Sequence, residues 1–229
     1  MPPVSVLMTV YNAGFYLQRA INSVLAQTLA DWELRIMEDG STDPLVSDVL
    51  AAVTDPRIRV ARFQPTIEQR RAHCRYARLI NLAARAAAGR YLTFLCGDDA
   101  YMPDRLARMV TMLDAGADVV YGAQQLCGEF DGDRGVRQTL GPLTRASALV
   151  DLNSVMLTRE SFDRVGGFDE DPSIWRWADG VFWNKLTDAG YVFQPVPGGP
   201  TDVKTYRDQG QPAALSVDAR VILGLDPWA

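Results

Sequence analysis

Two adjacent aspartates, Asp98 and Asp99, directly follow the apolar run "YLTFLCG". Neighbouring carboxylates repel each other unless a cation lies close to both. Carboxylate oxygens are preferred ligands of Mg²⁺ and Mn²⁺, which often bridge them to phosphate oxygens. The pair therefore indicates either a divalent-metal site or a simpler arrangement, in which one aspartate caps the following helix and the other is solvated.

Two further side chains follow apolar runs in the same way. Asp39, in "IMEDGS", can accept a hydrogen bond from a base N–H or a ribose hydroxyl, or it can stabilise the turn that follows. Tyr11 comes just after the first apolar run, where its ring can stack on a base or pack against its neighbours. Each residue alone is compatible with a purely structural role.

A fourth acid, Asp179, lies in the aromatic stretch "SIWRWADGVFWNKL". Apolar surroundings raise the pKa of a carboxylate and make it a better proton acceptor. The alternative is a helix N-terminal aspartate that interacts with the helix dipole. The surrounding aromatic residues form either core or a platform for a sugar ring; they are Trp175, Trp177, Phe182 and Trp183.

Alternating strands and helices must position these residues. Over the first 125 residues we predict strands at Val4–Val10, Trp32–Met37, Arg57–Phe63, Tyr91–Leu95 and Val119–Gly122. Between them we predict helices at Phe15–Ala26, at 43–53 with Asp43 or Thr42 as cap, at Glu68–Ala88 ended by Gly89, and at Pro103–Leu113. This alternation predicts a mostly parallel α/β sheet, in which ligands bind beyond the carboxyl ends of the strands. The loops "YNAG", "EDGSTD" and "CGDDAY" all fall at such ends.

The chain beyond residue 124 is less regular. The polar stretch "GEFDGDRG" predicts a hairpin or flexible loop, and strands are expected at Val155–Thr158 and Tyr191–Gln194. We predict a short helix ended by Gly166 and Gly167, and a further helix over Trp177–Ala189. The Gly- and Pro-rich segment 195–212 is expected to be irregular.

Composition restricts the class of protein. The 229 residues are 48% apolar and carry a net charge of −5, which fits one globular domain and argues against a general nucleic-acid binder. Nine arginines between residues 57 and 90, against one acid, form a local basic excess that suits a diphosphate or a solvated face. Three cysteines without metal-ligand spacing, and the lack of a signal peptide or of ~18 consecutive apolar residues, predict a cytoplasmic protein without a membrane span.

Two familiar catalytic arrangements lack support. His73 is the single histidine, and there is no G-x-S-x-G sequence that would indicate a Ser–His–Asp hydrolase. There is also no G-x-x-x-x-G-K-[ST] phosphate loop of the P-loop nucleotidases.

Taken together, the stretches "VSVLMTVYNAGFYLQRAINSVLAQTLADWELRIMEDGSTD" and "INLAARAAAGRYLTFLCGDDAYMPDRLARMVTML" resemble the family 2 inverting glycosyltransferases, which have a GT-A fold. The resemblance covers residues 4–125 and, less closely, 153–190. It implies a single domain with a nucleotide-sugar-binding half over 1–125, an acceptor-binding half over 126–200 and a flexible tail over 201–229.

The resemblance also implies roles for individual residues. Tyr11 and Asp39 would bind the nucleobase, and Arg70 or Arg71 would face the base or the diphosphate. Asp98 and Asp99 would bind nucleotide and Mg²⁺ or Mn²⁺, with Asp99 as the more direct ligand. Asp179 would be the general base that activates a hydroxyl of a small-molecule or glycan acceptor, while the donor would be UDP- or dTDP-linked.

The chain departs from the family pattern at three places. Many family members have an acid where this chain has Cys96, the acid pair at the base position is reduced to Asp179, and no late histidine is present. Lys204, Tyr206 or Arg207 are candidates for closing over the diphosphate instead. Two rival hypotheses stay open: a metal-dependent nucleotidyltransferase, which would normally have more than the single glycine of "YNAG", and a non-catalytic nucleotide-sugar binding module.

Overall fold

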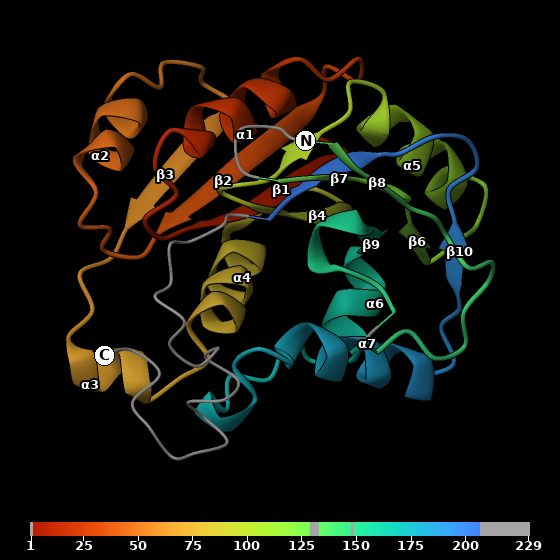
Figure 1. The fold of residues 1–229 in the computed structure, drawn as a ribbon. Coiled ribbons are helices and arrows are strands. Elements are labelled where there is room, and N and C mark those ends of the chain that lie inside the picture. The colour runs from red at the N-terminus through yellow and green to blue at the C-terminus, as the bar shows by residue number, and fades with distance from the viewer. Residues whose placement is uncertain (1, 129–132, 148, 207–229) are drawn as a thin grey trace.

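The larger of two sheets forms the centre of the molecule (Figure 1). The computed structural model describes residues 2–128, 133–147 and 149–206. The strand order is β10-β6-β9-β4-β1-β2-β3. The strands are β1 (Val4–Val10), β2 (Trp32–Glu38), β3 (Ile58–Arg62), β4 (Tyr91–Cys96), β6 (Val119–Tyr121), β9 (Val155–Thr158) and β10 (Phe193–Pro195). Only β9 runs antiparallel to its neighbours, which confirms the predicted mostly parallel α/β sheet.

Helices cover both faces of this sheet (Figure 1). One face packs against α1 (Tyr16–Leu25), α2 (Pro44–Ala51) and α5 (Arg105–Asp114). The other packs against α4 (Arg75–Ala86), α6 (Arg159–Arg164) and α7 (Ala178–Asp188). The central strand β1 supplies both cores, because Val6 and Met8 face the first set of helices while Leu7 faces the second.

The predicted long helix over Glu68–Ala88 is wrong, because the chain forms two helices there. A capping box of Thr66 and Gln69 begins α3 (Ile67–Arg71), which ends at Ala72. Cys74 has extended backbone angles, and its N–H donates to the carbonyl of Glu170 at 2.8 Å, so a tertiary hydrogen bond holds the break open.

The second helix, α4, ends before the glycine that was expected to stop it. Its C-cap is Ala87, and β4 begins four residues later at Tyr91. Gly89 instead allows the chain to pack closely against β1, because a Cβ at this position would lie only 2.6 Å from the backbone nitrogen of Ser5.

A smaller sheet has the order β5-β11-β7-β8. Its strands are β5 (Ala100–Tyr101), β7 (Gln124–Cys127), β8 (Asp133–Arg137) and β11 (Asp202–Thr205). β7 and β8 pair antiparallel, which agrees with the hairpin and not with the flexible loop as the alternative for this stretch. β11 corrects the expectation of an irregular segment over 195–212. Its partners β7 and β5 are remote in sequence, so no local pattern reveals the pairing. Tail positions from Arg207 onward lie outside the described residues.

The other predicted strands and helices agree with the observed bounds to within two residues. The cap of α2 is Asp43, whose side chain accepts from the N–H of Leu45 at 3.0 Å. The described residues also include the short 3-10 turns η2 (Leu152–Ser154) and η3 (Pro172–Ile174). Across the part of the chain that the structure describes, none of the helices is both long and apolar enough to cross a membrane.

Candidate active site

A cavity of about 180 Å³ lies at the carboxyl ends of β1 and β2. Residues that face it include Tyr11, Asp39, Arg70, Arg75, Tyr76 and Trp175. The two strands are linked where they end, because the N–H of Asp39 donates to the carbonyl of Val10 at 2.9 Å. The structure thus brings together Tyr11 and Asp39, the two residues expected to bind a base.

Two arginines enclose the Asp39 carboxylate, whose side chain is only 4% exposed. Arg70 donates to one carboxylate oxygen at 3.0 Å, and Arg75 donates to both oxygens, one of them through Nε at 3.2 Å. The Arg70 guanidinium also lies over the Tyr11 ring, 4.4 Å from its centroid. These contacts fix a flat, polar surface with an aromatic side, which suits a planar heterocycle.

The break between α3 and α4 explains how both arginines reach one carboxylate. Arg70 comes from the last turn of α3, and Arg75 is the first residue of α4. Arg71, the alternative to Arg70 in the sequence, is exposed and does not face the cavity. The sequence identifies Arg75 only as one of the nine arginines of the basic excess. Nothing in it shows that the predicted helix over Glu68–Ala88 is interrupted before Arg75.

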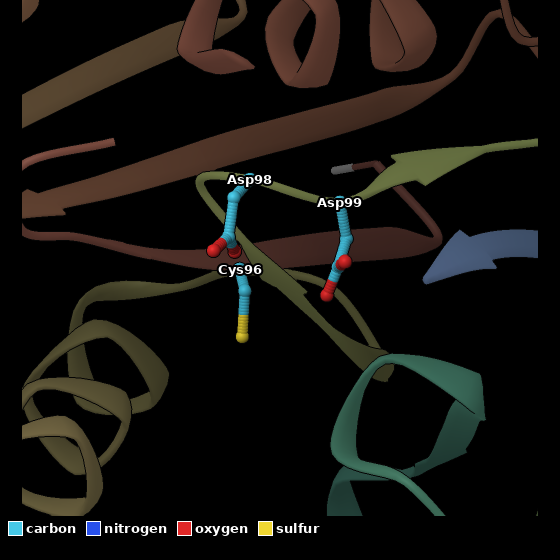
Figure 2. Close-up of side chains that lie close together, drawn as sticks. All are labelled: Cys96, Asp98 and Asp99. Carbon is cyan, nitrogen blue, oxygen red and sulfur yellow. The ribbon is translucent and has the colours of Figure 1, made fainter. Parts of the chain in front are cut away.

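Cys96, Asp98 and Asp99 form a second cluster at the end of β4 (Figure 2). One potential ligand atom from each lies within 4.8 Å of the others. Asp98 is half-buried, and its backbone carbonyl accepts from Arg19 at 3.0 Å. Burial strongly raises the pKa of the Cys96 thiol, which therefore stays protonated beside the two aspartates.

Asp99 is fully buried and held by three donors. Its oxygens accept from the N–H of Thr205 at 2.7 Å, from Lys204 Nζ at 3.1 Å and from the side-chain amide of Asn153. Burial raises its pKa to about 7, although the ammonium of Lys204 works in the opposite direction. Asn153 and Lys204 were not singled out as partners of Asp99, since each lies more than 50 residues away in sequence.

The cluster fits a hard divalent ion through its oxygens. A neutral thiol is a poor ligand for Mg²⁺ or Mn²⁺, which leaves the carboxylates of Asp98 and Asp99. Asp99 already serves three donors inside the fold, so Asp98 is the better placed of the two to bind an ion. One carboxylate supplemented by phosphate oxygens is a common way of holding Mg²⁺.

Asp179 lies in the first turn of α7 and is connected to the cavity. Its N–H donates to the Tyr76 hydroxyl at 3.0 Å, and its own carboxylate accepts from the N–H of Gly180 at 2.8 Å. Burial raises the pKa of Asp179, the charge of Asp151 adds to the increase, and Lys204 opposes it. The carboxylate is therefore a stronger proton acceptor than a solvated aspartate.

The aromatic residues around Asp179 divide into two groups. Phe182 and Trp183 are fully buried and pack with Phe94 and Phe168 in the core. Trp175, by contrast, faces the cavity. Trp177 lies directly before α7 and is 60% exposed.

The sequence is similar to known glycosyltransferases. Residues 5–168 match the family model "Glycosyl transferase family 2". Protein CgeD of Bacillus subtilis is 34% identical over 198 residues, which is 81% of this chain and 46% of CgeD. The UDP-Glc:alpha-D-GlcNAc-diphosphoundecaprenol beta-1,3-glucosyltransferase WfgD of Escherichia coli is 34% identical over 110 residues, 48% of this chain and 40% of WfgD. The chain spans about half the length of the curated relatives it matches.

The fold is also similar to a solved structure. Residues 1–349 of TarS from Staphylococcus aureus, in complex with UDP-GlcNAc, match with a TM-score of 0.70 and 18% identity over 93% of this chain and 61% of that chain. This similarity confirms the expected GT-A arrangement of the sheet and helices. With the family model covering most of the sequence, the chain belongs to glycosyl transferase family 2.

Proposed function

We propose that this chain transfers a sugar from a UDP- or dTDP-linked donor to an acceptor hydroxyl, with inversion at the anomeric carbon. The observation that carries this proposal is the convergence of three features at one sheet edge: a base-sized cavity, a pair of aspartates and a half-buried carboxylate. Membership of glycosyl transferase family 2 supports the same reaction type.

In this proposal the cavity binds the nucleobase. The base stacks beside Tyr11, and Asp39 accepts a hydrogen bond from a ring N–H while Arg70 and Arg75 hold the carboxylate in place. Uracil and thymine have a ring N–H between two carbonyls. This pattern fits the Asp39 carboxylate as acceptor with the arginines Arg70 and Arg75 as donors on either side. WfgD, which is a UDP-Glc-dependent enzyme by name, and the UDP-GlcNAc complex of TarS favour UDP.

The diphosphate would lie at the end of β4. Mg²⁺ or Mn²⁺, bound through Asp98 with Asp99 behind it, would neutralise the negative charge that develops on the leaving diphosphate. Arg19 fixes the backbone of this loop, since it donates to the Asp98 carbonyl at 3.0 Å.

Asp179 is the proposed general base. It removes the proton from the acceptor hydroxyl as that oxygen forms a bond to the anomeric carbon. The bond from this carbon to the diphosphate oxygen breaks on the opposite face, and the nucleoside diphosphate leaves with the electron pair. The raised pKa of Asp179 suits proton acceptance near neutral pH.

The first experiment is a thermal-shift comparison of UDP, dTDP, GDP and CDP, with and without Mn²⁺. A ligand that binds only the native state stabilises it by about 2.7 kcal/mol at a hundredfold excess over its dissociation constant. We expect a uracil or thymine nucleotide to give the largest shift. No shift with any of the four would overturn the proposal.

Product analysis then separates sugar transfer from its rivals. With a panel of nucleotide sugars and acceptors, a glycosyltransferase releases a free nucleoside diphosphate, and NMR of the product gives the anomeric configuration. A nucleotidyltransferase releases inorganic pyrophosphate. Binding without any turnover across the panel would favour a non-catalytic module.

A further inference from the structure

Lys204 is a buried cation in the middle of the candidate site. Its Nζ lies 3.1 Å from a carboxylate oxygen of Asp99 and 3.4 Å from one of Asp151. Asp151 caps η2, where its side chain accepts from the N–H of Asn153. One ammonium group therefore joins two loops, one after β4 and one before β9.

A lysine side chain carries a positive charge at neutral pH, and the carboxylates of Asp99 and Asp151, at 3.1 and 3.4 Å from Nζ, favour that charged form. An ammonium has three N–H donors, and two face these carboxylates. Within the described residues the third N–H has no acceptor, so it can donate to a ligand, and 23% of the side chain is exposed.

The backbone around Lys204 is fixed by the same loop that carries Asp98. The next residue, Thr205, donates its N–H to Asp99 at 2.7 Å, and β11 pairs with β7 through Lys204 and Leu126. Two residues before Lys204, Asp202 is fully buried, and its carboxylate lies 2.9 Å from Arg105. The contacts of Nζ with Asp99 and Asp151 already restrict the lysine rotamers, so less side-chain entropy is lost when Lys204 binds a ligand.

The local charge needs this cation if a diphosphate is to bind. Three carboxylates interact electrostatically with Lys204: those of Asp98, Asp99 and Asp151. A diphosphate adds at least two more negative charges. A single divalent ion at Asp98 does not balance these charges, and Lys204 supplies a positive charge between Asp99 and Asp151, in addition to Arg137 on the other side of Asp151.

We propose that Lys204 is a diphosphate-binding residue, a cation that Asp99 and Asp151 position beside the leaving group. This inference rests on the proposed function. It assigns Asp99 to the lysine and Asp98 to the divalent ion, so nucleotide binding depends on two cations. The protein therefore keeps measurable affinity for a nucleoside diphosphate after the metal is removed.

Calorimetric titration of Lys204→Met with UDP and with uridine, in Mn²⁺ and in EDTA, tests this inference. The wild-type protein should bind UDP in EDTA no more than about tenfold more weakly than in Mn²⁺. Lys204→Met should lose at least tenfold in UDP affinity under both conditions while its uridine affinity stays within twofold. Lys204→Arg, which keeps the charge, should recover most of the UDP affinity.

Arg137→Met is the matched control, because Arg137 is the other cation beside Asp151, at 3.9 Å, and its removal changes net charge equally. It should leave UDP affinity within twofold. If Lys204→Met does not fold, Lys204→Gln makes the same comparison.

Three outcomes would contradict the inference. Equal UDP binding by wild type and Lys204→Met in EDTA, or a parallel loss of UDP and uridine, would show that Lys204 is only structural. A wild-type protein that binds no UDP or dTDP under any condition would overturn the proposed function and this inference with it.

Discussion

The Tyr76 hydroxyl accepts a hydrogen bond from the backbone N–H of Asp179 at 3.0 Å. Tyr76 also forms part of the wall of the cavity that contains Asp39. Burial strongly raises the pKa of Tyr76, so the phenol stays neutral. The contact joins two residues that are 103 positions apart and sets the first turn of α7 against the proposed nucleotide site.

The first prediction concerns Asp179→Asn. The amide oxygen can still accept from the N–H of Gly180, but the side chain can no longer take a proton. We expect turnover to fall by about 10²–10⁴-fold, while the dissociation constant for UDP changes less than twofold. Asp188→Asn, an exposed aspartate at the other end of α7, is the control and should keep full turnover. Unchanged turnover in Asp179→Asn would exclude it as the base.

The second prediction is the pH dependence of that reaction. Burial raises the pKa of Asp179, and only the deprotonated form can act as base. kcat should therefore rise tenfold per pH unit on the acid side and level off above a midpoint higher than the ~3.9 of an ordinary aspartate. The residual activity of Asp179→Asn should lack this acid limb. A midpoint at the ordinary value would mean that another group titrates.

The same raised pKa makes a third prediction, about stability. The folded state binds the Asp179 proton more tightly than the unfolded chain, so Asp179 costs stability as pH rises from the unfolded pKa through the folded one. Above that window Asp179→Asn should melt at a temperature no lower than the wild type. Each 1 kcal/mol gained corresponds to about 2–4 °C in Tm for a domain of this size. A clear fall in Tm at pH 8 would contradict the unfavourable burial of this charge.

The strand-end positions of the site were open to prediction, because they depend on local patterns. Short apolar runs followed by turn residues locate β1, β2 and β4, and parallel strands bring Tyr11, Asp39 and Asp98 to one edge. Local spacing also gives the helix that carries Asp179. Each of these residues is adjacent in sequence to the strand or helix that positions it, so local patterns were enough to locate it.

The remaining contacts depend on tertiary structure. The backbone bond from Cys74 to Glu170 interrupts the expected helix and turns Arg75 toward Asp39. Lys204 lies in "TDVKT", which is too short and too close to Gly198 and Gly199 to indicate a strand. Its place is decided by pairing with β7, about 80 residues earlier, so no window of the sequence contains both partners.

The fourth prediction distinguishes Arg70 from Arg71. Arg70 binds Asp39 and lies over Tyr11, whereas Arg71 is exposed outside the cavity. Arg70→Met should weaken UDP binding by about 10–100-fold, because it removes a charge-assisted hydrogen bond and a cation–π contact. Arg71→Met removes the same charge from the same helix and should change the affinity less than twofold. Equal effects would indicate that the basic excess acts only through its net charge.

The fifth prediction concerns the buried ion pair that holds β11. Arg105 and Asp202 are both fully buried and lie 2.9 Å apart, and Arg105 also donates to Thr93 and to the carbonyl of Asn153. Arg105→Met leaves the buried carboxylate of Asp202 without its cation, and it leaves Thr93 and the carbonyl of Asn153 without this donor. Denaturant unfolding should show a loss of about 3–5 kcal/mol.

Two comparisons make this fifth prediction specific. Arg90→Met breaks the exposed pair with Asp114 and should cost no more than about 1 kcal/mol. The double variant Arg105→Met/Asp202→Leu removes both buried charges, so it should be more stable than Arg105→Met alone, since no unpaired carboxylate remains. If the double variant lost the sum of the two single losses, the pair would not be coupled. β11 and Lys204 would then be held chiefly by the backbone pairing with β7.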